Sequence, residues 1–452
     1  MNNIRKRFTL VLAGLMLVSL LAGCGSGNEK PSASANATNP DSGGTASAEP
    51  TVQGQKDLEG EIVIWSWSEG EVKLLAENFN KVYPNVKVKY VPIDNGDVTA
   101  KLQAAAVSGG DFPDIAYQEV LSRGKLFSMD IWEDLSQSPY GVDKSLIQTP
   151  LLSYMETADG RILGVDREFS PSGFVFRRSL AKEYLGTDDP QEVFGQISDW
   201  DRFIEVGKQV REKSGGKVYM LAGLDDINWM LSGQYKDAVF TDNTAKLTPY
   251  FTHMLDPMIK IRDAGIAGKM KRWTPAWNAS YNEGNILIYE YAPWSGNAAL
   301  KPNAPDAAGD WTVIPATGGP YSMGGTAYGI PKKAKNKELA WEFIRWTLLT
   351  EEGVEASVKA LGSVPSYKPY ADALPDGSDP YFNGQDVTKF LLEEVAPDMQ
   401  LRGVNEYDGV LNDVMNQMMG MIENDSNLGL DKAVELAIAE SKKKLPSTMR
   451  IE

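Results

Sequence analysis

Aromatic and acidic side chains occur together where a short strand is predicted to end. Residues 61–70 read EIVIWSWSEG, and the two-residue repeat of a strand places Trp65 and Trp67 on one face. A helical pattern begins at once after this stretch, so Trp67 and Glu69 lie at a strand-to-helix junction. Open α/β sheets bind ligands at such junctions, beyond the carboxyl ends of their strands. We therefore expect these two residues at a ligand site, with Trp65 partly in the core.

Residues of the same kinds recur further along the chain. They are Gln118, Glu119, Trp229, Trp294 and Tyr407. Aromatic rings can lie against the C–H faces of sugar rings, and carboxylates and amides can bind sugar hydroxyls. A single tryptophan is more often part of a core, but several of these residues fall at the ends of predicted elements. The set indicates a site for a hydroxyl-rich ligand.

The chain offers little equipment for other chemistry. It contains one histidine, His253, and one cysteine, Cys24, which argues against histidine or cysteine metal clusters, thiol catalysis and a Ser-His-Asp hydrolase. We find no phosphate-binding loop, dinucleotide fingerprint or complete EF-hand loop in the sequence. We therefore predict no catalytic residue, no metal site and no cofactor.

Strand and helix patterns alternate behind the first candidate residues. A helical pattern follows residue 70, a strand begins at Val86, a second helix covers residues 98–107, and a further strand begins at Asp114. Gly109 is suited to the left-handed conformation that ends a helix. This β-α-β-α-β order predicts an α/β fold with a parallel sheet and right-handed crossovers. Because 452 residues exceed one core of ordinary size, we expect at least two domains.

The first residues have the features of an export signal. Arg5, Lys6 and Arg7 precede an apolar run that ends in Leu-Ala-Gly-Cys at residues 21–24. This ending resembles the bacterial lipobox, in which the signal is cut before a cysteine that is then lipidated. We therefore predict a lipoprotein signal peptide over residues 1–23 and lipidation of Cys24. Residues 24–56 are rich in Ser, Ala, Gly, Asn and Pro and predict a flexible tether.

The charge of the chain limits its partners. The formal net charge is −16, and removal of the basic signal would make the remainder more acidic. Such a surface repels nucleic acid and anionic lipid. We therefore expect no nucleic-acid partner, and we expect membrane contact through the lipid at Cys24 alone.

Several segments together resemble the extracellular solute-binding proteins of carbohydrate ABC transporters, the group that includes maltose-binding protein. The matching pieces, in the order typical of that family, are the lipobox, IVIWSW, AAAVSGGDFPDIAYQE, ILIYEYAPWSGN, the pair Gly324-Gly325, and KNKELAWEFIRWTLLTEEG. The resemblance implies a two-lobed, type II periplasmic-binding-protein fold with a hinge and an interlobe cleft. Lobe one would comprise residues 57–165 and 295–350, and lobe two residues 166–294 and 351–452.

The resemblance also implies a function. The protein would be a lipid-anchored, monomeric receptor on the extracellular face of a bacterial membrane that captures an oligosaccharide and delivers it to an ABC permease. Closure of the two lobes around the ligand is the mechanism of periplasmic binding proteins. The ligand residues that the resemblance carries over are Trp65, Trp67, Glu69, Gln118, Glu119, Trp229, Trp294, Gly324 and Tyr407.

Two alternatives remain open, and one feature departs from the family pattern. Carboxylates beside aromatic rings would also suit an extracellular glycoside hydrolase, and the same fold could carry a non-sugar solute such as a polyamine or a metal chelate. At the expected crossing between lobes, the chain has three arginines, Arg167, Arg177 and Arg178. We expect them to form salt bridges in the hinge; the alternative is that one of them binds the carboxylate of a uronate sugar.

Overall fold

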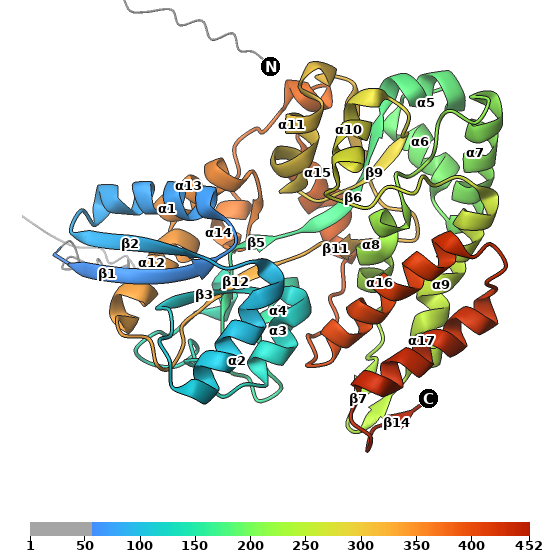
Figure 1. The fold of residues 1–452 in the computed structure, drawn as a ribbon. Coiled ribbons are helices and arrows are strands. Elements are labelled where there is room, and N and C mark those ends of the chain that lie inside the picture. Colours follow the sequence, from blue (N-terminus) through green and yellow to red (C-terminus); the bar gives the residue numbers. More distant parts are fainter. Residues whose placement is uncertain (1–56) are drawn as a thin grey trace, which may run out of the picture. The chain divides into compact units, whose positions relative to one another are not determined.

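The first sheet has a parallel core, as the order of its elements predicts. The computed structural model describes residues 57–452. Strands β1 (Gly60–Ser66), β2 (Val86–Pro92) and β3 (Ile115–Glu119) are parallel, with α1 (Glu69–Val82) and α2 (Val98–Ser108) between them. Strand β12 (Thr326–Gly329) pairs antiparallel with β3 and with β4 (Val165–Asp166), which gives the order β2-β1-β3-β12-β4 (Figure 1). The predicted parallel sheet is confirmed for the first three strands.

Both faces of this sheet are covered. Ile62 and Ile64 of β1 join one apolar cluster together with residues of α1 and α12 (Lys337–Leu349). Trp65, on the opposite face of β1, joins a second cluster with Leu102 of α2. Helix α13 (Glu351–Leu361) packs beside α1 and α12. The end of β1 is therefore buried at consecutive positions, Ile64 to Ser66, because helices cover both faces of the sheet.

A second sheet is built around β6 (Pro171–Arg177). Strands β9 (Ile288–Tyr291), β10 (Trp311–Ile314) and β11 (Tyr321–Ser322) all pair antiparallel with it. The helices of this part of the chain are α5 (Arg178–Leu185), α6 (Pro190–Ile197), α7 (Trp200–Lys213), α8 (Asn228–Gln234), α9 (Leu247–Ala264), α10 (Pro275–Glu283), α16 (Asp408–Asn424) and α17 (Leu430–Lys444). Phe174 and Val175 of β6 belong to two different apolar clusters, so this sheet is also covered on both faces.

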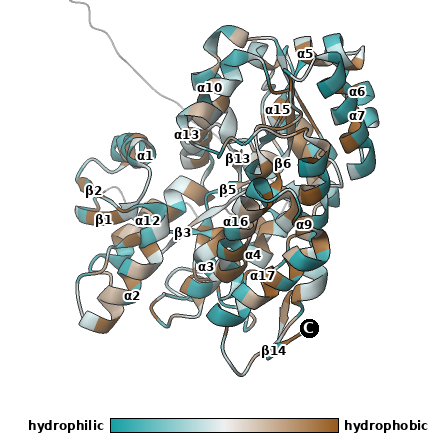
Figure 2. Cartoon of the chain, turned by 45° about the vertical axis from the view of Figure 1, so that its right-hand side comes forward, coloured by the Kyte–Doolittle hydropathy of each residue, from teal (hydrophilic) through white to brown (hydrophobic). Residues whose placement is uncertain are grey.

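The remaining elements are short. They are α3 (Val120–Phe127), α4 (Leu152–Met155), α11 (Lys301–Asn303), α14 (Lys368–Ala371), α15 (Val387–Phe390), β5 (Glu168–Phe169), β7 (Phe240–Thr241), β8 (Thr244–Ala245), β13 (Val364–Pro365) and β14 (Arg450–Ile451). Polar and apolar residues alternate around the longer helices (Figure 2), as expected for helices with one buried face. Among the described helices, none combines the length and the apolar character of a membrane span.

The chain passes between the two sheets in several places. Strands β4, β5 and β6 follow one another from the first sheet to the second, and β11 and β12 lead back. Strand β5 lies between the two sheets (Figure 1), and it pairs there with β13 through Phe169 and Val364. These connections are the expected hinge segments of a two-lobed α/β protein, and residues 57–452 lie within one compact unit.

The strand pairing bears on where the lobes divide. We expected residues 295–350 to return to lobe one, but β10 and β11 in that range pair with β6 of the second sheet, and β12 is the first strand to rejoin the first sheet. We also expected residues 351–452 in lobe two, whereas α13 packs on α1 and α12. The bounds of the two lobes stay a prediction; the pairing of β10 with β6 carries no local sequence signal.

Candidate functional site

The carboxyl ends of β1 and β3 lie at one edge of the first sheet. Their parallel register pairs Ile64 with Ile115 and Trp65 with Ala116, so the residues that follow also lie near one another. Trp67 is half-buried, and its ring meets Tyr117 edge-on at 5.4 Å. Glu69 is exposed at the start of α1. Trp67 and Glu69 therefore have the positions that the strand-to-helix junction predicts.

Trp65 and Gln118 lie deeper than the other predicted site residues. Trp65 is 8% exposed and packs in the cluster around α2. Gln118 is fully buried, and its amide Nε2 donates to the carbonyl oxygen of Leu163 at 3.1 Å. Its side chain fills the space beside Gly164 and Gly329, where a methyl group would clash with it. These contacts indicate that both side chains pack in the interior and hold the edge of the sheet in place.

Glu119 is placed to interact with polar groups at this edge. Its carboxylate caps α3 and accepts a hydrogen bond from the backbone N–H of Leu121 at 2.9 Å. Burial raises the pKa of Glu119 to about 7, although the backbone N–H groups and Arg123 oppose this shift. Near neutral pH its carboxyl group can therefore both donate and accept hydrogen bonds.

The segment from β11 to β12, which we call the second crossing, leads back to the same edge and contacts Trp294. The indole Nε1 of Trp294 donates to the carbonyl oxygen of Met323 at 3.2 Å, and Gly324 follows with a φ of 77° that favours glycine. The next residue, Gly325, accepts a hydrogen bond from the backbone N–H of Val120 at 3.0 Å. The Gly324-Gly325 loop thus connects Trp294, which follows β9 of the second sheet, to the start of α3, which follows β3 of the first sheet.

Trp229 lines a small hollow of about 60 Å³ that adjoins this place. Val120 and Leu121 of α3 form one side of it, and Ser322, Asp408 and other residues of the second part of the chain form the rest. The volume suffices for a few water molecules and not for a sugar ring. Tyr407 lies just before α16, half-buried, with its ring 5.3 Å from that of Phe240.

The structure places the predicted site residues in two groups. At the carboxyl ends of β1 and β3 lie Trp67, Glu69 and Glu119, and the Gly324-Gly325 loop reaches this edge through the Val120–Gly325 hydrogen bond, with Trp294 held beside it by Met323. Trp229 lines the small hollow together with Ser322 and Asp408, and Tyr407 directly precedes Asp408.

Trp273 was missed by the sequence analysis. Its side chain is 51% exposed, and its ring lies nearly parallel to that of Trp294, with 6.2 Å between ring centroids and 21° between planes. The preceding residue, Arg272, is ion-paired with the buried Glu290. The only signal in the sequence is a tryptophan directly before the Thr-Pro pair that starts α10.

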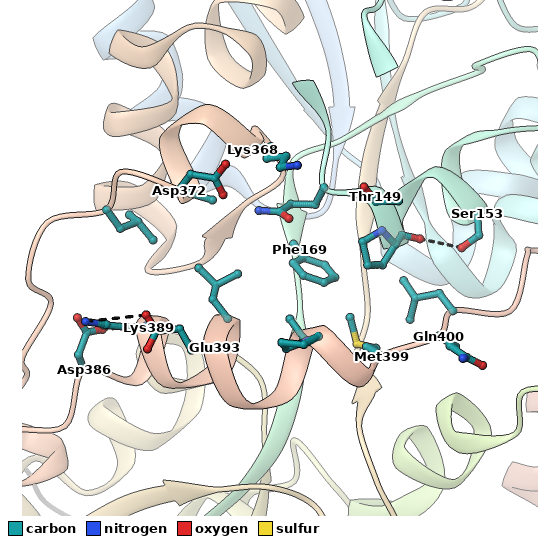
Figure 3. Close-up of a pocket in the computed structure, with 18 of the residues that line it drawn as sticks. Thr149, Ser153, Phe169, Lys368, Asp372, Asp386, Lys389, Glu393, Met399 and Gln400 are labelled. Atoms are coloured by element: carbon teal, nitrogen blue, oxygen red, sulfur yellow. Dashed lines mark hydrogen bonds and ion pairs between the residues drawn. The ribbon is translucent and has the colours of Figure 1, made fainter. Parts of the chain in front are cut away.

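A larger hollow of about 1510 Å³ was also missed (Figure 3). Its lining includes Phe169 of the hinge strand β5, and acidic and basic side chains such as Asp372 and Lys389 surround it. None of the nine predicted ligand residues lines it. The segments that line this hollow come together only through tertiary packing, so no sequence motif predicts it. They lie near residues 148–153, 368–376 and 386–401.

The three arginines of the crossing region all have carboxylate partners. Arg167 pairs with Glu71 and Glu168, and its side chain is only 12% exposed. The other two pairs are Arg177 with Asp310 at 2.9 Å and Arg178 with Asp188 at 2.5 Å. The contacts confirm that all three arginines form salt bridges, although Arg177 and Arg178 do so at the end of β6 and the start of α5 and not in the hinge; the uronate alternative gains no support from them.

Within residues 57–452, no group of three His, Cys, Asp or Glu side chains is arranged to hold a metal ion. Cys24, the signal peptide and the tether lie outside the described residues.

Comparison with known proteins identifies the family. The family model "bacterial extracellular solute-binding protein" matches residues 75–381, which is more than half of the chain. The protein therefore belongs to the bacterial extracellular solute-binding proteins. The family resemblance predicted from the motifs is confirmed, and so is its consequence that the protein binds a solute and is not an enzyme.

Two characterised relatives are similar over most of the chain. An arabinooligosaccharide-binding protein of Halalkalibacterium halodurans is 25% identical over 401 residues, which cover 80% of this chain and 86% of the relative. A lactose-binding protein of Rhizobium radiobacter is 24% identical over 361 residues, which cover 73% of this chain and 80% of the relative. Both relatives are binding proteins, and the glycoside hydrolase alternative gains no support from them.

Solved structures support the fold. A family 1 extracellular solute-binding protein has a TM-score of 0.74 at 22% identity, covering 85% of this chain and 99% of that structure. The galacto-N-biose/lacto-N-biose I-binding protein of Bifidobacterium longum has a TM-score of 0.71 at 18% identity, covering 87% and 99%. The predicted two-lobed fold of the periplasmic-binding-protein type is thereby confirmed.

Proposed function

We propose that this protein is the oligosaccharide receptor of an ABC importer. The observation that carries the proposal is the hydrogen bond of Val120, which follows Glu119 at the carboxyl edge of the first sheet, with Gly325 of the loop that Trp294 also contacts; Trp67 lies at the end of the neighbouring strand β1. Aromatic faces and polar groups from two sheets can then contact the two faces and the hydroxyls of one sugar. The hollow of Figure 3, by contrast, has a single aromatic residue, Phe169, among the residues that line it.

The proposed ligand residues are those that the sequence singled out. Trp67, Glu69, Glu119, Trp294 and Gly324 would contact sugar directly, because they lie at the strand ends and at the crossing. Trp65, Gln118, Trp229 and Tyr407 would complete the site from more buried positions or from its edge.

The names of the relatives suggest a class of sugar. Two of them are arabinooligosaccharide-binding proteins, from H. halodurans and Bacillus subtilis, and a third is a lactose-binding protein. We therefore take arabinose-containing and galactose-containing oligosaccharides as the first candidates. The acidic net charge of −16 and the paired arginines favour neutral sugars over uronates.

The site also suggests how binding is signalled. The pairing of β5 with β13 and the crossing from β11 to β12 are short connections about which two lobes can rotate. A ligand that contacts both lobes binds the closed form more tightly and so shifts the population toward it. The permease can then distinguish loaded from empty receptor by shape.

The location and partners form part of the same proposal. Lipidation of Cys24 would hold the protein on the extracellular face of the membrane, and residues 24–56 would let the monomer reach its permease. For the lobes we propose residues 57–166, 326–361 and the associated first-sheet helices as lobe one, with residues 171–322 and 408–452 in lobe two.

The experiment is a thermal-shift screen of residues 54–452 against arabinotriose, lactose, maltotriose, spermidine and a ferric chelate. A ligand that binds only the folded state raises its stability in proportion to ln(1 + [L]/Kd). A shift with one sugar that is reduced in Trp67→Ala, and kept in Trp341→Ala, supports the proposal. Trp341 is a partly buried tryptophan beside Tyr140, away from the site, and so serves as the matched control. A shift with spermidine or the chelate alone would contradict a sugar ligand.

A further inference from the structure

Trp273 adopts a backbone conformation that bulky residues avoid. Its φ is +64°, in the left-handed region where a side chain with a Cβ is disfavoured. Only two other described non-glycine residues have a positive φ, Asp242 and Asn383, and both are residues that tolerate it. Such strain persists where the surroundings enforce it, and it concentrates at functional sites.

The surroundings of Trp273 do enforce this conformation. On one side, the backbone N–H of Arg272 donates to the Asp225 carboxylate at 3.2 Å, and its guanidinium is paired with Glu290 and lies 3.9 Å from Asp226. The side chains of Arg272, Glu290 and Asp226 are at most 8% exposed, so these contacts are sheltered from water. On the other side, Thr274 caps α10. The chain therefore has fixed positions immediately before and after the tryptophan.

Packing does not account for a tryptophan at this position. The side chain of Trp273 is 51% exposed. The neighbouring Trp277, whose ring centroid lies 5.4 Å away, is only 4% exposed. At a positive φ a tryptophan is strained and a glycine is not, and the exposed half of this ring buries no apolar surface. The stability of the fold therefore does not explain why this position holds a tryptophan. Its exposed surface is thus available to a ligand.

The ring of Trp273 lies beside that of Trp294, which is a predicted ligand residue. Trp273 and Trp294 are nearly parallel, with 21° between their planes, and Trp294 is the less exposed of the two. Trp294 is also the member of the pair that contacts Met323 and the Gly324 loop. The two indoles therefore form a surface that extends from the second crossing outward to Trp273.

We propose that Trp273 is a second aromatic platform, which contacts the sugar unit adjacent to the one on Trp294. This inference rests on the proposed oligosaccharide function and makes it more specific: the ligand has at least two sugar rings, and Trp273 selects for the second ring. An exposed indole face that becomes covered by a sugar ring contributes about a tenfold gain in affinity.

The test measures, by calorimetric titration of residues 54–452, the affinity for an oligosaccharide and for the corresponding monosaccharide. The probes are arabinotriose with arabinose, and lactose with galactose. The variants are Trp273→Gly, which removes the ring and suits the left-handed φ, and Trp273→Phe, which keeps an aromatic face. Leu74→Ala is the control, because Leu74 is an exposed apolar residue of α1.

The proposal expects Trp273→Gly to weaken oligosaccharide binding about tenfold and monosaccharide binding hardly at all. Trp273→Phe should restore most of the affinity, and the melting temperature of the ligand-free Trp273→Gly protein should stay within about 3 °C of wild type, because the strain is relieved. Leu74→Ala should bind as wild type does.

Two results would overturn the inference while leaving the proposed function intact. One is wild-type affinity of Trp273→Gly for an oligosaccharide that the unmodified protein binds. The other is a large fall in the melting temperature of ligand-free Trp273→Gly, which would show that the residue acts through folding. Failure of the unmodified protein to bind any of these sugars would instead count against the proposed function, and the inference would fall with it.

Discussion

Arg123 and Asp166 form a bidentate ion pair that is completely buried, with both N–O distances at 2.8 Å. The same guanidinium donates to the carbonyl oxygens of Gln118 at 3.0 Å and Gly325 at 3.1 Å. One arginine of α3 therefore fixes the end of β3, the last residue of β4 before the hinge, and the loop of the second crossing. These are the segments on which the proposed ligand site depends.

Removal of this arginine should be strongly destabilising. Arg123→Ala leaves the Asp166 carboxylate buried without its partner, and loss of one member of a buried pair costs about 3–5 kcal/mol. Urea unfolding followed by circular dichroism measures the change. Arg161→Ala is the matched control, because the Arg161–Asp159 pair is exposed and should contribute less than about 1 kcal/mol. Equal effects of the two substitutions would contradict the role assigned to Arg123.

Glu119 should make stability depend on pH near neutrality. Burial raises the pKa of its carboxyl group in the folded protein to about 7, from an ordinary value of 4.5. The folded state therefore holds this proton more tightly than the unfolded state, so the contribution of Glu119 to stability falls as the pH rises from about 4.5 to 7.

The measurement is the melting temperature between pH 5 and pH 8. In Glu119→Gln the decline toward pH 8 should be shallower than in the wild type, because the amide does not titrate. Glu77→Gln, at an exposed position of α1, should leave the profile unchanged. Parallel profiles for wild type and Glu119→Gln would show that the Glu119 carboxyl group is not perturbed.

Gly124 should be intolerant of a side chain. It lies in α3, and a Cβ at this position would clash with the backbone of Asn405, in the segment that leads into α16. Gly124→Ala should therefore lower stability by about 1–3 kcal/mol, since backbone on the opposing side must move.

Gly195→Ala provides the opposite expectation. Gly195 lies inside α6, with nothing within 4 Å of an added Cβ. Alanine is the better helix former, so this substitution should stabilise the protein by about 0.5–1 kcal/mol. Chemical denaturation of both variants tests the pair. No destabilisation by Gly124→Ala would contradict the close packing described for α3, and destabilisation by Gly195→Ala would contradict the open space described beside α6.

The first sheet was predictable because its signals are local. The alternation around β1, the helical repeat of α1 and the glycine after α2 each depend on a few consecutive residues, and Gly109 does adopt the left-handed φ of 70° expected of it. The positions of Trp67 and Glu69 followed from the same junction. Residues at the ends of parallel strands can thus be located from sequence with some accuracy.

The parts that were missed depend on distant residues. The pairing of β10 with β6 joins residue 311 to residue 177, and no local pattern specifies it. The salt bridges of Arg167 were expected, but the identity of its partner Glu71 and the left-handed conformation of Trp273 arise from tertiary contacts. Trp65 and Gln118 have the residue types and positions of the other candidate site residues, but their side chains are buried. The sequence pattern alone could not distinguish residues that pack behind the site from residues that would contact a ligand.

The most direct test of the account is a calorimetric titration of residues 54–452 and of Trp294→Ala with the oligosaccharide that gives the largest thermal shift. Trp294 connects the second crossing to the aromatic surface, so the account predicts saturable 1:1 binding by the unmodified protein and a loss of about tenfold or more in Trp294→Ala. Equal affinity of the two proteins, or binding by neither, would contradict an oligosaccharide site at the meeting of the two sheets.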